Sequence, residues 1–216
     1  MKRIPMLLIA FFLTTACYSK EESGPANDSA PQTSLEQQEE KIVLPEPEVI
    51  AENLKVPWSI EKTGDTFYLS ERQGHIVKIA NGEVERQSVE LKKELADNSE
   101  SGLLGFALAA DFPESNVAYA YHTYKEDSQH LNRIITLRLE EGIWREADLL
   151  LDRIPGAPNH SGGRLKFGPD GMLYATTGDA SDKDIAQDRD SLGGKILRMN
   201  PDGTIPGDNP NPGSYV

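Results

Sequence analysis

Short apolar runs separated by turn residues make up most of the chain after Val49. The short β runs 66–70 and 75–79 flank Gln73 and Gly74, a pattern that predicts a β-hairpin. Further runs of this kind lie at 117–124, 132–140, 165–167, 172–177 and 195–199. Helical periodicity is nearly absent, and only 91–96 is expected to form a short turn of helix. The pattern therefore predicts an all-β domain.

A loose internal repeat runs through the same part of the chain. Each copy has an apolar strand, a tight turn and a second strand with an aromatic residue, and the copies start at Trp58, Gly105 and Leu165, 47 and 60 residues apart. A four-stranded propeller blade needs about 40–50 residues, and insertions between strands lengthen it. We therefore favour a β-propeller with about three blades over a single β-sandwich, which also has short, regularly spaced strands. Trp58 and Trp144 are expected to pack within the blades.

The first seventeen residues predict export and a lipid anchor. Lys2 and Arg3 precede the uncharged run 6–13, which is too short for a ~30 Å hydrocarbon core and is typical of a signal peptide. Small residues before Cys17 resemble a bacterial lipobox, in which the cysteine is diacylated, although the large aliphatic residue lies one place too early, at Leu13. The alternative is an ordinary secretory signal with an incidental cysteine. Because Cys17 is the only cysteine, disulfides and cysteine metal clusters are excluded.

Composition divides the rest of the chain into a linker and a domain. Residues 18–48 have eight acidic and two basic residues and almost nothing to bury, so they are expected to form a disordered, self-repelling tether. Residues 49–216 are long enough for one domain with a core. The net charge of −13 and the absence of a basic stripe exclude a nucleic-acid partner.

The candidate catalytic residues lie between residues 159 and 179. His160 lies in a predicted loop that opens onto a strand, and Asp179 closes the next strand. A histidine near neutrality is a natural base for the proton of a sugar hydroxyl, and a carboxylate can orient it. Gly162 and Gly163 are expected to let a flat ligand approach the backbone. A surface or capping role is the alternative for a histidine in a loop.

The other histidines and the aspartate-containing turns give weaker signals of a functional site. His75, His122 and His130 lack a ligand-type spacing and are expected at the surface of strands or loops. The segments 201–203 and 207–209 lack the alternating acidic ligands of a calcium loop and are expected to be turns. The sequence therefore assigns no metal ligand among these residues.

Three blocks resemble one known family, in order and in spacing. They are HSGGRL at 160–165, followed by GPDG at 168–171 and the pair 178–179; SGLLGFALAADF at 101–112; and GKILRMNPDGTIPGDNP at 194–210. Together they are similar to the soluble quinoprotein glucose and aldose sugar dehydrogenases. The resemblance covers nearly everything after Lys55.

The resemblance implies a six-bladed β-propeller that oxidises an aldose at its anomeric carbon. Hydride passes to pyrroloquinoline quinone (PQQ), which lies flat in a central cleft with a calcium ion at its edge. His160 falls on the catalytic base and Asp179 on the carboxylate that holds it. Asn159 falls where many members have aspartate, and Glu100 falls where glutamine is common, both on the substrate side. An ionised glutamate only accepts hydrogen bonds, so these departures leave the identity of the sugar open.

The resemblance also implies partners, and the signal segment that ends at Cys17 implies a location. A sugar and an external electron acceptor are expected, with Cys17 anchoring the protein on the outer side of the cytoplasmic membrane, or a secreted protein as the alternative. Most quinone and calcium ligands are expected beyond residue 216. About three blades cannot close a ring, so the chain could also associate into an oligomer. The competing hypotheses are a non-catalytic propeller that binds a protein or glycan and an inactive truncated fragment.

Overall fold

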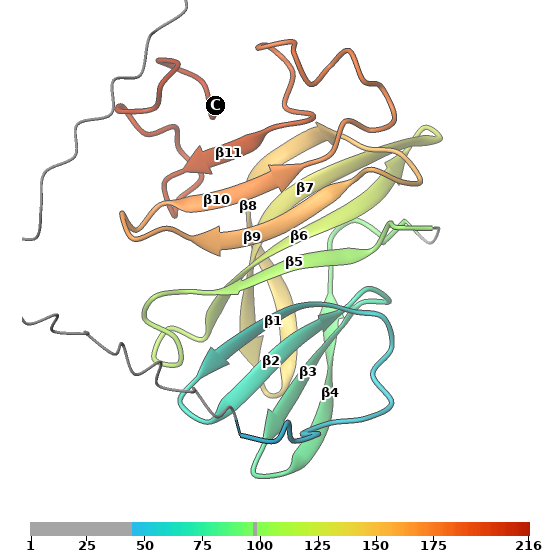
Figure 1. Cartoon of the computed structure of the whole chain (residues 1–216), viewed down its shortest axis with the longest axis vertical. Helices are drawn as coiled ribbons and strands as arrows, with labels where there is room; N and C mark the ends of the chain where they lie inside the picture. The colour runs from blue at the N-terminus through green and yellow to red at the C-terminus, as the bar shows by residue number, and fades with distance from the viewer. Residues whose placement is uncertain (1–44, 97–98) are drawn as a thin grey trace, which may run out of the picture. The chain divides into compact units, whose positions relative to one another are not determined.

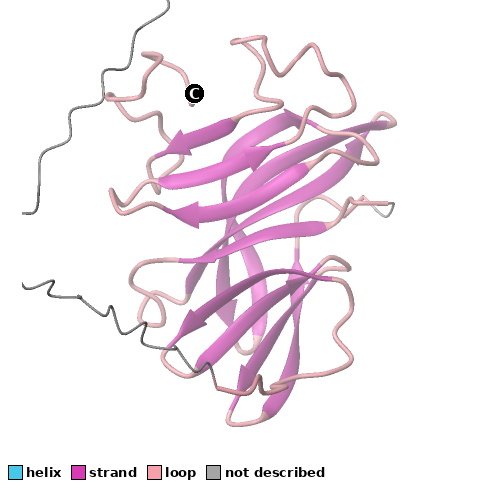
Figure 2. Cartoon of the chain, viewed as in Figure 1, coloured by secondary structure: helices cyan, strands magenta, loops and turns pink. Residues whose placement is uncertain are grey.

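The computed structural model describes residues 45–96 and 99–216. This part of the chain consists of strands and loops without a helix (Figure 2), so none of it could cross a membrane as a helix. Residues 47–216 form one compact unit. The predictions for the signal 1–17, for Cys17 and for most of the linker lie outside the described residues.

The strands form three antiparallel groups in chain order, and a short parallel pairing between the last strands of the first two groups joins them into one eight-stranded sheet. The first blade has four strands, β1 (Pro57–Thr63), β2 (Thr66–Glu71), β3 (His75–Ala80) and β4 (Glu83–Glu90). The second also has four, β5 (Leu103–Leu108), β6 (Val117–Glu126), β7 (Gln129–Glu140) and β8 (Ile143–Pro155). The third contains β9 (Gly162–Phe167), β10 (Leu173–Thr177) and β11 (Ile196–Met199).

The blades meet along their first strands. β1, β5 and β9 run in the same direction (Figure 1), with β5 in the middle: Ser59 Oγ donates to the Leu104 carbonyl at 3.4 Å, and a Cβ on Gly105 would lie 2.4 Å from the Gly163 carbonyl oxygen. At the outer edge only two residue pairs, starting with Val89 and Trp144, join β4 to β8 in parallel. In a propeller the blades are repeated around a central axis, with one strand of each blade innermost. The side-by-side first strands β1, β5 and β9 match this arrangement, so the prediction of about three blades is confirmed and a sandwich of two facing sheets is excluded.

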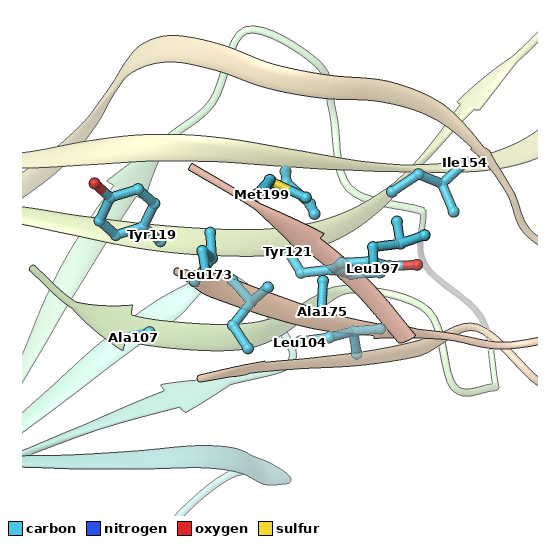
Figure 3. Packing of buried hydrophobic residues seen from close by; sticks show 11 residues of the cluster. Leu104, Ala107, Tyr119, Tyr121, Ile154, Leu173, Ala175, Leu197 and Met199 are labelled. Atoms are coloured by element: carbon cyan, nitrogen blue, oxygen red, sulfur yellow. The ribbon is translucent and has the colours of Figure 1, made fainter. Parts of the chain in front are cut away.

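The second blade is buried on both faces. Tyr119 and Tyr121 of β6 pack against the third blade, with Leu173 and Met199 among their neighbours (Figure 3). The alternate β6 residues, including Ala120, face the first blade. A strand buried on both faces has no polar side, which explains why β6 is apolar or aromatic at nearly every position from 117 to 124.

An aromatic cluster packs between the first and the second blade. The fully buried ring of Trp144 meets Phe106 edge-on, with ring centres 5.3 Å apart, and its Nε1–H donates to Gln87 Oε1 at 2.9 Å. Trp144 is therefore a packing residue, as predicted, but it lies between two blades rather than within one. Trp58 of β1 is only partly buried, and the Arg164 guanidinium lies over its ring, 4.9 Å from the ring centre.

Two predictions from the sequence are wrong. Residues 91–96 form no helical turn, because Leu95 bridges to Tyr124 and the Ala96 N–H donates to the Thr123 carbonyl at 2.8 Å, so this segment is attached to the end of β6. His122 is not a surface residue. It is fully buried on β6, and burial, followed by the nearby Arg133 charge, lowers its pKa to about 4.

Candidate active site

The predicted site residues meet at one end of the inner strands. Glu100 precedes β5, Asn159 and His160 precede β9, and Asp179 follows β10. Since β5 and β9 run side by side in the same direction, the segments that precede them meet at the same end. The hairpin from β9 to β10 then returns the chain to this end, which brings Asp179 to His160.

The main chain of His160 is held on both sides. Its N–H donates to Glu100 Oε2 at 2.7 Å, and its carbonyl accepts from the Ala180 N–H at 3.2 Å. Between them the residue adopts φ +56°, the left-handed region, which costs a residue other than glycine about 1–3 kcal/mol. A hydrogen bond to an ionised group contributes about 1.5–3 kcal/mol and one between neutral groups about 1 kcal/mol, so the two together can offset this strain.

The imidazole of His160 is oriented by Asp179. The Nδ1 atom lies 2.9 Å from Asp179 Oδ1, which also accepts the Ser181 N–H at 2.9 Å. The hydrogen bond with His160 and then that with Ser181 lower the pKa of Asp179, so its carboxylate is ionised near neutral pH. An ionised carboxylate only accepts, so Nδ1 carries a proton, and in the neutral form of the ring Nε2 is the nitrogen with the lone pair. The His160 side chain is 58% exposed, which leaves it accessible from solvent.

Asn159 contacts the loop that follows Asp179. Its Oδ1 accepts from Ser181 Oγ at 2.8 Å. Ala180 and Ser181 both have left-handed backbones, with φ +51° and +63°. Three residues other than glycine in this region, within one small group, mark a strained segment, and such strain is concentrated at functional sites.

The two glycines after Ser161 have a structural explanation. Gly162 and Gly163 have φ +68° and +95°, and a Cβ on Gly162 would lie 2.5 Å from the Gly178 nitrogen. A Cβ on Gly163 would lie 2.9 Å from Leu104. Backbone conformation and close packing within and between blades therefore require these glycines. The hypothesis that they admit a flat ligand has no support from this geometry.

Two groups that the sequence analysis did not single out complete the site. Tyr121 reaches from the core, where its hydroxyl donates to the Ser161 carbonyl at 2.9 Å, and burial raises its pKa well above the usual value. Ser181 connects Asp179 with Asn159. The sequence predicted a strand at 117–124 but gave no sign of this contact, and nothing in the sequence marked Ser181.

An open pocket of about 430 Å³ lies beside the imidazole, and its lining is mainly acidic. The lining residues are His160, Asp179, Ser181, Asp182, Lys183 and Asp184. Three aspartates and one lysine give this lining a net negative charge, so positive groups for the carboxylates of a quinone would have to come from other residues. Within 45–96 and 99–216 no group of three histidine, cysteine or acidic residues is placed to hold a metal. The residues of this pocket are therefore suited to proton transfer, and the described part of the chain assigns no ligand to PQQ or calcium.

The fold and this site define a class of protein: a propeller with an aspartate-oriented histidine exposed at one end of its inner strands. The chain belongs to the glucose/sorbosone dehydrogenase family, whose model matches residues 54–215. This match confirms the predicted family and, with the solved relatives, the fold class.

Individual relatives agree with this assignment. Aldose sugar dehydrogenase YliI of Escherichia coli (strain K12) is 28% identical over 176 residues, which cover 76% of this chain and 46% of the relative. Quinoprotein glucose dehydrogenase B of Acinetobacter calcoaceticus is 29% identical over 195 residues, 76% of this chain and 41% of the relative. The chain thus spans about half the length of the curated relatives it matches.

A solved structure extends the comparison to three dimensions. The PQQ-bound form of aldose sugar dehydrogenase from Streptomyces coelicolor superposes with a TM-score of 0.71 and 37% sequence identity. The match covers 78% of this chain and 52% of that one. The similarity therefore includes most of the described blades.

Proposed function

We propose that the complete gene product oxidises an aldose at its anomeric carbon, with PQQ as the electron acceptor and His160 as the base. The family supports sugar oxidation in general, and the names of the relatives supply the aldose and the quinone. The geometry of His160 carries the proposal: Nδ1 lies 2.9 Å from the Asp179 carboxylate, the ring is exposed, and no hydrogen bond to Nε2 is found among the described residues.

His160 would handle the proton in this reaction. As C1 of the sugar loses its hydrogen with two electrons, the C1 hydroxyl must lose its proton, and the product is a lactone. Nε2 takes that proton, and the imidazolium that forms is stabilised by Asp179 at Nδ1. When bound, the quinone supplies the acceptor for the hydride.

The proposal includes a location. We propose that Cys17 carries the lipid and that residues 18–48 hold the propeller away from the outer side of the cytoplasmic membrane. Calcium is proposed as a cofactor from the resemblance alone. The external electron acceptor would reach the propeller from the exported side.

Replacing the base tests the proposed reaction. In the complete gene product supplied with PQQ, calcium and a panel of aldoses, His160→Gln should lower the rate of dye reduction by about 10²–10⁴-fold, the usual contribution of a general base. His75→Gln, on β3 of the first blade, is the matched control and should retain the wild-type rate. Equal rates for His160→Gln and wild type would remove His160 from the mechanism. No oxidation of any aldose by the wild type would favour a binding propeller.

A further inference from the structure

We propose that Glu100 is a positioning residue, whose carboxylate holds the main chain of His160 in the left-handed conformation that directs the imidazole to Asp179. The inference rests on the proposed function, because it assigns Glu100 to the placement of the base. It differs from the substrate contact that the family resemblance implies for this position.

Glu100 attaches to the histidine loop at two points. Its own N–H donates to the Pro158 carbonyl at 3.0 Å, and its Oε2 accepts from the His160 N–H at 2.7 Å. The two residues are 60 positions apart, on the connections that enter the second and the third blade. One residue therefore ties the loop at 157–160 to the start of β5, across the boundary between the blades.

The contact acts on a strained part of the loop. His160 has φ +56° without the freedom of glycine, so its conformation depends on the groups around it. Its carbonyl side is fixed by the Ala180 N–H and, one residue on, by Tyr121, whose hydroxyl holds the Ser161 carbonyl. The only contact on its amide side is with Glu100, among the hydrogen bonds of the described residues. Removal of the carboxylate would free that side, and the ring would no longer be held toward Asp179.

The chemistry of the contact distinguishes positioning from substrate binding. A main-chain N–H requires only an acceptor, and a glutamine amide oxygen can replace the carboxylate oxygen. A positioning role thus predicts that Glu100→Gln keeps most of the function and that Glu100→Ala loses it. A substrate contact predicts that both substitutions change KM and the preference among sugars, because the carboxylate can only accept whereas the amide can also donate.

Hydrogen–deuterium exchange tests the placement independently of catalysis. It is measured at the amides of 159–161 in the complete gene product without sugar. Glu100→Ala should accelerate exchange at His160 about 10-fold or more, because the amide loses its acceptor, and Glu100→Gln should restore most of the protection. Glu114→Ala is the matched control, because this glutamate lies in the loop after β5, at the opposite end of that strand. Unchanged exchange in Glu100→Ala would overturn the proposal.

Kinetics of the same variants with PQQ and calcium provide the second readout. Glu100→Ala should lower kcat about 10–100-fold with little change in KM, the usual effect of a displaced catalytic group. Glu100→Gln should recover most of this loss. A raised KM and altered sugar preference in both variants, with normal exchange at His160, would assign Glu100 to the substrate instead. If the wild type oxidises no aldose, the proposed function fails, and exchange still decides whether Glu100 holds the loop.

Discussion

Gly178 is the residue where the smallest change should do the most damage to the site. It lies one position before Asp179, and a Cβ built on it would be 1.6 Å from the His160 carbonyl oxygen. Real Cβ atoms do not approach other atoms closer than 3.0 Å, so Gly178→Ala must push the two backbones apart by about 1.4 Å. The backbone of Gly178 is not in the left-handed region, so the effect of alanine is steric.

This displacement falls on His160, the proposed base. It breaks the hydrogen bond from Ala180 to the His160 carbonyl and moves the ring relative to Asp179. A misplacement of about 1 Å costs about 10²-fold in rate, and overpacking costs about 1–3 kcal/mol of stability. We therefore expect Gly178→Ala to lose about 100-fold in kcat and to melt a few degrees lower.

Dye reduction with an aldose, PQQ and calcium measures the rate in the complete gene product, and a thermal melt measures the stability. Gly207→Ala is the matched control, because Gly207 also lies outside the left-handed region and a Cβ there would meet nothing within 4 Å. Its rate and melting temperature should equal those of the wild type. Full activity in Gly178→Ala would show that the position of the His160 backbone does not limit the reaction.

Two further predictions concern acid stability and the lipid anchor. His122 stays neutral in the folded protein down to a pH of about 4, whereas the unfolded chain binds its proton near pH 6.5. The unfolded state thus binds more protons between these values, and lowering the pH from 6.5 to 4 should cost up to ~3 kcal/mol of unfolding free energy. Urea unfolding across this range should show a shallower loss in His122→Gln, and equal slopes would refute the assignment. Metabolic labelling with a tagged fatty acid should mark the wild type but not Cys17→Ser, and label in both or in neither would contradict lipidation.

The sequence predicted those strands whose burial produces a visible pattern of apolar residues. β6 lies between two blades, so its apolar and aromatic residues stood out, and the inner strands were found through their repeat. β4 and β8 were missed because they form the outer edges, where β4 has only one fully buried residue, Gln87. The burial of His122 was missed for a related reason, since one polar residue does not reveal that both faces of its strand are covered.

The sequence predicted which residues belong to the candidate site, but it did not predict the contacts between them. The block at 160–165 and the terminal aspartate identified His160 and Asp179, which lie within hydrogen-bonding distance of each other. Their roles stay predictions. The left-handed backbone of His160 has no signal in the sequence, since a histidine does not require it. The contact between Glu100 and His160 depends on how two blades pack, which local patterns do not specify.

The candidate site lies at the start of the inner strands, away from the parts of the blades whose length can vary. Glu100 and His160 are 60 residues apart in sequence, and the whole second blade lies between them. The long strands β7 and β8 and the turns that join them extend outward from β5, so residues can be inserted there without moving either partner. Members of such a family can therefore differ in blade size while the geometry around His160 stays constant. The copies of the repeat in this chain, which start 47 and 60 residues apart, already differ in length.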